Sequence, residues 1–154
     1  MADKNSNPSD AAPSVGYWHL WTDGDGISHH ALCALEHFEL GAAGDIAPQW
    51  NDKQPKGATT VVFVVLPVGW VGEWHENPAP QWILPLSGRW WVEAMDGSRT
   101  EMGAGELSLG EDQHCVADEH GKKGHRSGTI GDEPAVLMTV QLHRAAVREP
   151  CHTK

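Results

Sequence analysis

The sequence predicts an all-β fold in a single domain, and three observations support this. The chain has 154 residues, which is the usual length of one domain. Short runs of β-branched and aromatic residues recur along it, separated by turns that contain Gly, Pro, Asn or Asp. No long segment carries the apolar period of a helix, and no internal repeat occurs. Short strands at close spacing are typical of a β-sandwich or β-barrel.

Expected strands follow one another from residue 17 to residue 142. The clearest is 59–67 (TTVVFVVLP), a continuous β-branched run of the kind found in buried strands. Residues 29–40 contain the helix formers Ala, Leu and Glu, but they also alternate, and we favour a strand. Asp96 and Gly97 are typical of a tight hairpin. The other strands are expected at residues 17–21, 73–77, 81–86, 89–95, 106–109, 125–130 and 135–142.

The ends of the chain differ in composition from its centre. Residues 1–15 are small, polar and interrupted by Pro, so we expect a disordered tail. Residues 16–146 form the predicted β-barrel domain, and residues 147–154 a C-terminal tail. A short helix after Leu142 is an alternative, which Pro150 would end.

Composition excludes several function classes. The formal net charge of −10 does not attract nucleic acid or anionic membranes, and the 11 Lys and Arg are dispersed. No apolar run is long enough to span a membrane and no signal-peptide pattern begins the chain, so a cytoplasmic protein is expected. Cys33, Cys115 and Cys151 are scattered and odd in number, which argues against disulfides and for a reducing compartment.

A group of polar residues in the central segment predicts a pocket. His75 and Asn77 are two residues apart, so in an extended chain their side chains point to the same side. Gln81 begins the next expected strand after a Pro-containing turn, and Gly88 makes the turn that follows this strand. Three polar side chains therefore converge from two connected strands.

The spacing of this segment resembles the first motif of the cupin family. That motif reads Gly, five residues, His-x-His, three or four residues, Glu, six residues, Gly. Its positions are occupied here by Gly69, His75, Asn77, Gln81 and Gly88, with every gap fitting but with Asn and Gln replacing the second His and the Glu. The resemblance implies a jelly-roll-like cupin β-barrel with the site at its mouth, and a homodimer.

The second cupin motif is matched more loosely. His125 is the candidate for its His, downstream of the strand that opens at Gly105. A longer loop, residues 113–123, replaces the short turn of the motif, the usual Pro is missing, and Thr129 stands near the place of its Asn. The resemblance covers about residues 59–142.

The resemblance also implies a divalent metal, which could be Fe, Ni, Mn or Zn. Its mapped ligands are His75, Gln81 and His125, with Asn77 binding substrate or water. Imidazole binds these metals well, whereas an amide oxygen is a weaker ligand without charge, so the affinity should fall below the family norm. A metal-free polar pocket stays open as the alternative.

Neighbouring residues supply further candidates. Glu73 has the parity of His75, so it could face inward as a ligand or as a catalytic base. His114 and His120 are other possible ligands, in a loop that we expect to be solvated. One of Trp90 and Trp91 must point inward, and we assign Trp91 to the wall of the substrate pocket. Trp74 and Trp82 should face away from it.

The predicted function is a metal-dependent enzyme of the cupin type acting on a small molecule. Catalytic roles fall to His75 and Glu73, and the favoured chemistry is a dioxygenase-type reaction on a small carbonyl or enol compound. A non-enzymatic ligand-binding protein and a metal-free isomerase or epimerase, with His75 as base, are the alternatives. No G-x-S-x-G elbow or P-loop occurs, and Cys115 is a doubtful nucleophile. The remaining histidines are expected to be surface or structurally bonded residues, namely His19, His29, His30, His37, His143 and His152.

Overall fold

The computed structural model describes residues 11–42 and 46–153, and within these ranges all the regular secondary structure is β-strand. This confirms the all-β prediction. Residues 1–10, most of the predicted disordered tail, lie outside the described residues. The strands are β1 (Val15–Thr22), β2 (Ser28–Leu35), β3 (Glu39–Gly41), β4 (Gln49–Asn51), β5 (Thr59–Leu66), β6 (Gln81–Ser87), β7 (Arg89–Ala94), β8 (Arg99–Gly103), β9 (Ser108–Glu111), β10 (His125–Ile130) and β11 (Ala135–Leu142).

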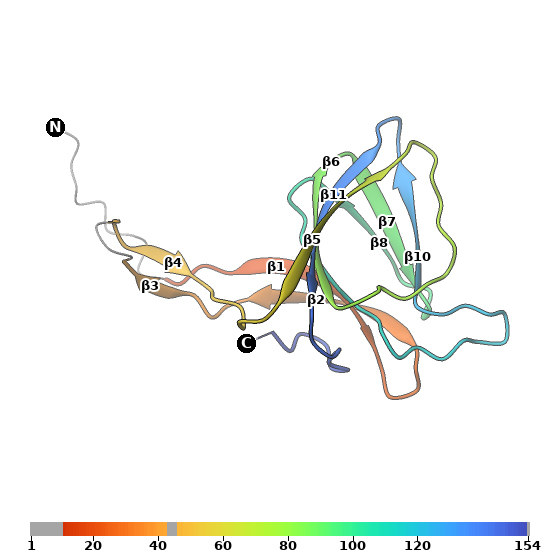
Figure 1. The fold of residues 1–154 in the computed structure, drawn as a ribbon, viewed down its shortest axis with the longest axis horizontal. Coiled ribbons are helices and arrows are strands. Elements are labelled where there is room, and N and C mark those ends of the chain that lie inside the picture. The colour runs from red at the N-terminus through yellow and green to blue at the C-terminus, as the bar shows by residue number, and fades with distance from the viewer. Residues whose placement is uncertain (1–10, 43–45, 154) are drawn as a thin grey trace.

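Two sheets face each other and form the body of the molecule (Figure 1). The larger sheet has six strands in the order β2-β1-β9-β6-β11-β5, of which β1 and β9 are parallel and the other neighbours antiparallel. The smaller sheet is antiparallel, in the order β10-β7-β8. The short pair β3 and β4 projects from this body as an arm (Figure 1).

The hydrophobic core lies between the two facing sheets. Ile83 and Leu137 bury their side chains from the larger sheet, and Trp90, Val92 and Met102 from the smaller one. Because side chains alternate along a strand, each sheet presents one such apolar face to the other. Full burial of one large apolar side chain stabilises the fold by roughly 1.5–3 kcal/mol.

The segment 29–40 is extended, as predicted, but it is divided between two strands, β2 and β3. β2 pairs with β1 along its whole length, from Thr22 opposite Ser28 to Val15 opposite Leu35. The chain then leaves the strand and re-enters one at β3. Pairing with β1 outweighs the weak helix preference of Ala and Leu, because propensities amount to less than about 1 kcal/mol per residue. The expected strand at 73–77 is reduced to one bridge, between His75 and His125.

The prediction that the cysteines are unpaired is wrong for two of the three. Cys33 and Cys151 form a disulfide across 118 residues of sequence, and Cys115 is free and buried. The cysteine pattern therefore no longer supports a reducing compartment. The described part of the chain contains no helix that is long and apolar enough to cross a membrane.

The C-terminal segment, residues 143–153, packs against the body. The Tyr17 hydroxyl and Thr153 Oγ1 lie 2.6 Å apart in a hydrogen bond, and the disulfide holds Cys151 nearby. The tail predicted at 147–154 is thus attached as far as Thr153, and the alternative helix after Leu142 does not form.

The disulfide should stabilise the fold measurably. We expect the Cys33→Ser/Cys151→Ser double variant to lose about 2–5 kcal/mol of unfolding free energy, because a long loop is no longer closed in the unfolded chain. Urea denaturation measures this loss, and thiol titration of the denatured protein should find one thiol without reductant and three with it. Reductant should destabilise the wild type and leave the double variant unchanged. Three thiols in the unreduced protein would contradict the pairing.

Candidate functional site

The structure brings together the two histidines of the predicted pocket. His125 begins β10, and His75 pairs with it in an isolated bridge with two backbone hydrogen bonds of 2.9 Å. The centroids of the two imidazole rings are 4.5 Å apart. His125 is buried and His75 is exposed, so the pair lies at the boundary between the core and solvent.

The hydrogen bonds of the two rings determine where their protons lie. His75 Nδ1 donates to the Glu73 carbonyl oxygen at 2.7 Å, and His125 Nδ1 donates to Asp112 Oδ2 at 2.6 Å. Both partners only accept, so in the neutral rings both Nε2 atoms carry a free lone pair. Histidines that ligate metals are oriented in the same way, by a carbonyl or a carboxylate on the other ring nitrogen.

Asp112 is the centre of this network and was not singled out from the sequence. Its side chain is fully buried, and Oδ1 accepts hydrogen bonds from Asn77 N at 2.9 Å and Asn77 Nδ2 at 2.7 Å. Burial alone would raise the pKa of Asp112, but the charge of His125 and the hydrogen bonds from His125 and Asn77 outweigh it and lower that pKa. Asp112 is therefore an ionised carboxylate at neutral pH.

The amides of Asn77 and Gln81 continue the network. Because Asp112 can only accept, Asn77 must turn Nδ2 toward it, and Asn77 Oδ1 then accepts from Gln81 Nε2 at 2.6 Å. This leaves Gln81 Oε1 as the oxygen available to a ligand. Gly110 makes room for Asn77, since a Cβ there would lie 2.5 Å from Asn77 Nδ2. Asn77 thus positions Gln81, and its role as a substrate contact stays a prediction.

Two further predicted site residues are placed elsewhere. Glu73 is exposed and meets His75 through its backbone carbonyl, so the expectation of an inward carboxylate fails. Trp91 lies under the guanidinium of Arg99, which is 4.2 Å from its ring centroid, whereas Trp90 belongs to the core between the sheets. Trp90 is thus the residue of the pair that points between the sheets, and Trp91 points to the other face of β7.

The alternative ligands in the 113–123 loop are also accounted for. The side chains of His114 and His120 are exposed, as expected for a solvated loop. His30, in contrast, lies close to the site. Burial, as the largest cause, and the charge of His125 lower the pKa of His30 to about 4, although Asp96 acts in the opposite direction. His30 is therefore a neutral imidazole at neutral pH, and its Nδ1 is bonded to Ser98 Oγ at 3.0 Å.

A second cluster lies on the other face of the larger sheet. His19, Glu111 and His152 offer one ligand atom each, all within 4.8 Å of one another, a spacing that could hold a metal ion. All three are at least partly buried. No sequence pattern links the three, because Glu111 is 92 residues from His19 and 41 residues from His152 along the chain.

The polar atoms of this second cluster are already paired in hydrogen bonds. The backbone N–H of Cys151 donates to His19 Nδ1 at 3.2 Å, so His19 carries its own proton on Nε2 and donates it to Glu111 at 3.0 Å. His152 and Arg144 donate to the same carboxylate. A metal would have to displace these protons, whereas the hydrogen-bonded form anchors the C-terminal segment without one.

Most of the other histidines are structurally bonded, as expected. His29 bridges Asp23 and Asp96, and His143 Nε2 lies 2.8 Å from Thr60 Oγ1.

Comparison with known proteins leaves the family open. A crystal structure of protein NMB1881 from Neisseria meningitidis is similar over 64% of this chain and 89% of that one, with 19% sequence identity and a TM-score of 0.41. No family model and no curated protein matches the chain. At that TM-score the similarity carries no argument, and we infer function from this chain's own residues.

The Glu111 network should make stability depend on pH. Burial would raise the pKa of Glu111, but hydrogen bonds from His19, Arg144, His152 and Val147 lower it from 4.5 to about 2. A carboxyl with a lowered folded-state pKa stabilises the fold above its unfolded pKa and loses this effect as the pH falls toward the folded value. At neutral pH the contribution is about 3 kcal/mol.

Glu111→Gln tests this dependence. Its unfolding free energy in urea should fall below that of the wild type by about 3 kcal/mol at neutral pH, and this gap should close between pH 4.5 and about 2. Glu101→Gln, at an exposed position on β8, is the matched control and should follow the wild type. A gap of constant size across this range would show that Glu111 acts by shape rather than by charge.

Proposed function

We propose that this protein is a small-molecule enzyme of the cupin type, with a divalent metal bound by His75, His125 and Gln81. The observation that carries the proposal is that the two adjacent imidazoles are hydrogen-bonded in the same way. Each donates its Nδ1 proton to a fixed acceptor and leaves Nε2 free. Gln81 adds its Oε1, which the network through Asn77 leaves available.

The donor set fits such a metal. Two neutral imidazoles and one amide oxygen suit Fe, Ni, Mn or Zn, and three protein ligands leave coordination positions open for substrate. Asp112 supports the site from behind, because it bonds both His125 and Asn77. The two facing sheets with a polar site at their boundary agree with a cupin-type jelly roll, which we propose as the finer description of the fold.

The chemistry would act on a small compound with a carbonyl or enol oxygen. A bound metal supplies a Lewis acid that polarises such an oxygen or presents the substrate to dioxygen, so a dioxygenase-type reaction is the leading class. The protein contributes orientation and a neutral environment. His30 stays uncharged beside the site because of its burial, so it adds no positive charge that would compete with a cation.

A metal-free isomerase or epimerase is the second candidate, and one observation favours it. The buried Asp112 carboxylate lies 2.6 Å from His125 Nδ1, which orients the ring and leaves Nε2 free to accept a proton. In this reading His125 Nε2, rather than His75, takes the proton from the carbon next to a carbonyl group.

Metal content distinguishes these functions. We expect near-stoichiometric Fe, Ni, Mn or Zn in elemental analysis of untagged protein, lost in His75→Ala and His125→Ala. His37→Ala, at an exposed position outside the site, is the control and should keep the metal. Asp112→Asn should weaken metal affinity by about 10–100-fold, because the Asp112 carboxylate orients the ligands without touching the metal.

Three outcomes decide the matter. Metal lost with either site histidine, together with oxygen uptake on small dicarbonyl or enol compounds, supports the proposal. Metal kept in those variants but lost in His152→Ala moves the site to the second cluster. A protein that takes up no added metal overturns the metalloenzyme and leaves the isomerase or a non-enzymatic binding protein.

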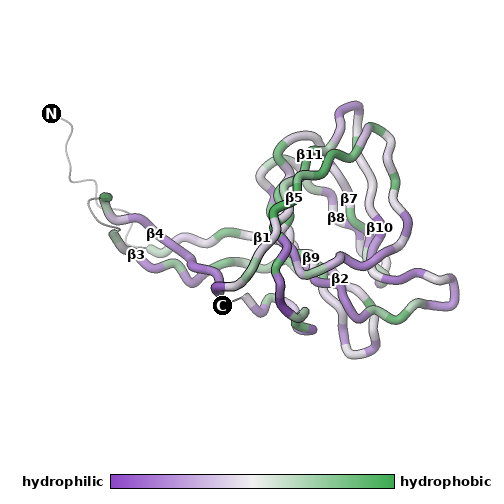
Figure 2. The backbone as a smooth tube through the Cα atoms, in the orientation of Figure 1, coloured by the Kyte–Doolittle hydropathy of each residue, from purple (hydrophilic) through white to green (hydrophobic). Residues whose placement is uncertain are grey.

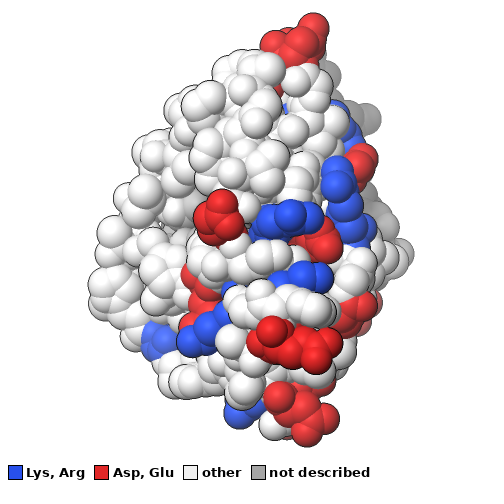
Figure 3. Space-filling view, turned by 90° about the vertical axis from the view of Figure 1, so that its right-hand side faces the viewer, with Lys and Arg blue, Asp and Glu red and all other residues white. Residues whose placement is uncertain are grey.

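A homodimer is part of the same proposal, and the outer face of β5 is where the second copy would pack. Val61, Phe63 and Val65 are exposed there, with Phe63 at 66%. The same face continues on β11 with Val136, Met138 and Val140. Figure 2 shows β5 and β11 as strongly hydrophobic. Figure 3, which views the right-hand side of Figure 1, shows a broad uncharged area beside a zone where acidic and basic side chains mix.

The position of β5 favours a second copy as the occupant of this face. β5 is the outermost strand of the larger sheet, so its free side offers unpaired backbone groups. Two such strands can pair across a twofold axis, and because neither face carries a charge, no unpaired charge is buried.

Light scattering after size exclusion tests the dimer. Phe63→Lys should convert it to a monomer, because symmetry places two like charges in one apolar interface. Leu32→Lys is the matched control, since Leu32 is also 66% exposed but lies on β2 at the opposite edge. A wild-type monomer, or equal effects of both variants, would overturn this interface.

A further inference from the structure

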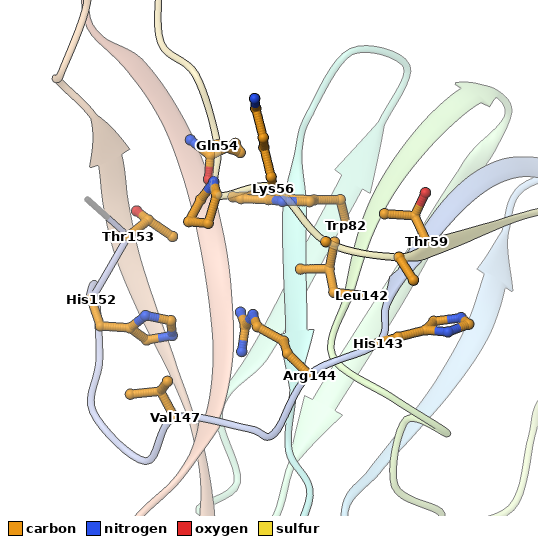
Figure 4. Close-up of a pocket in the computed structure, with 13 residues that line it drawn as sticks. Gln54, Lys56, Thr59, Trp82, Leu142, His143, Arg144, Val147, His152 and Thr153 are labelled. Carbon is orange, nitrogen blue, oxygen red and sulfur yellow. The ribbon is translucent and has the colours of Figure 1, made fainter.

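A cavity of about 370 Å³ lies outside the site described above. It opens where the connection between β4 and β5 passes near the C-terminal segment, and Trp82 forms part of its wall (Figure 4). Gln81 and Trp82 are neighbours on β6 and point to opposite faces of the sheet. The cavity is therefore on the outer face, whereas the His75–His125 site is on the inner one. Its volume is within the range of about 300–1,000 Å³ typical of small-molecule sites.

The lining of this cavity is positively charged, whereas the chain as a whole is negatively charged. The sequence has 21 acidic and 11 basic residues, yet the described residues that line the cavity include Lys56 and Arg144 and no Asp or Glu. Lys56 forms no ion pair within residues 11–42 and 46–153. The lining is thus a local basic spot on an acidic protein, which attracts an anionic group.

Arg144 is held in place at this wall. Its Nη1 donates to the carboxylate of Glu111 and to the carbonyl of Ala145 at 2.8 Å, and its side chain is 35% exposed. A guanidinium has five N–H donors, so donors remain for a ligand after these two bonds. Glu111 offsets part of the positive charge of Arg144, and Lys56 supplies the charge that is not offset.

The apolar part of the wall is flat and rigid. The indole of Trp82 is half-buried, and its ring packs edge-on against Tyr17 with the centroids 5.1 Å apart. Leu142 and Val147 continue the apolar lining. In the view of Figure 4, Trp82 lies between Lys56 and Arg144. The two cations are thus on opposite sides of the indole, so a flat ring stacked on the side of Arg144 can bring an acidic group to that guanidinium.

We propose that this cavity binds a small aromatic carboxylate, with its ring on Trp82 and its carboxylate at the free donors of Arg144, while Lys56, on the other side of the indole, adds to the positive potential that attracts the acid. The site is separate from the proposed metal centre and does not depend on it. An aromatic acid fits both features of the lining, because it combines a planar apolar body with a single negative charge.

The test uses ligand-observed NMR titration of the full-length protein with 2-naphthoate and with its neutral isostere, 2-naphthamide. We expect saturable binding of the acid, about tenfold tighter than that of the amide at low salt, with the difference reduced at high salt. Equal affinities for acid and amide, or no saturable binding of the acid at millimolar concentration, would overturn the proposal.

Variants locate the binding and separate it from the proposed metal centre. Lys56→Glu should weaken binding of the acid about tenfold and leave that of the amide unchanged. Lys53→Glu, in the same connection but outside the lining, is the matched control and should bind as the wild type does. Trp82→Leu, checked for folding by circular dichroism, should weaken both probes. His125→Ala should bind both probes normally, and loss of binding there would assign them to the inner site instead.

Discussion

The buried carboxylate of Asp112 is the constraint on which the inner site depends. It accepts hydrogen bonds from a ring nitrogen of His125 and from the backbone and side-chain amides of Asn77. A buried, ionised carboxylate must be satisfied by donors, because an unpaired charge in the core would cost several kcal/mol. That requirement holds β10 and the segment before β6 in one arrangement, and it orients His125 and, through Asn77, Gln81.

Its neighbour Glu111 performs the corresponding task on the opposite face. Consecutive residues of an extended chain point to opposite sides, so two adjacent carboxylates enter two separate networks. Asp112 organises the inner site, whereas Glu111 collects His19, His152 and Arg144 and thereby anchors the C-terminal segment. The disulfide to Cys33 secures the same segment covalently.

This attachment divides the outer face of the larger sheet. Over β1 and β9 the face is covered by the C-terminal segment, and Tyr17 and Leu109 are buried there. Over β5 no described part of the chain covers the face, which is apolar. The cavity beside Trp82 lies between these two parts, with Arg144 from the covered side in its lining. One short segment therefore forms part of the cavity wall and leaves the β5 face exposed.

The sequence by itself determined the strand content and the central pair of the inner site. The run 59–67 and the alternation of 135–142 are read directly from residue type, because strand formation depends on local side-chain pattern. The resemblance to the two cupin motifs predicted that His75 and His125 lie together, and their rings are adjacent in the structure. Asp112 could not be recognised, since its importance comes from partners 13 and 35 residues away.

Only the tertiary structure decided which faces are inner and outer and which distant residues meet. Local alternation shows that Trp90 and Trp91 point to opposite sides, but only the facing sheet shows that Trp90 is the inward one. The pairing of Cys33 with Cys151, 118 residues apart, likewise follows from the path of the chain. The physical reason is the same in each case: side-chain direction is local, whereas burial and contact depend on how the sheets pack together.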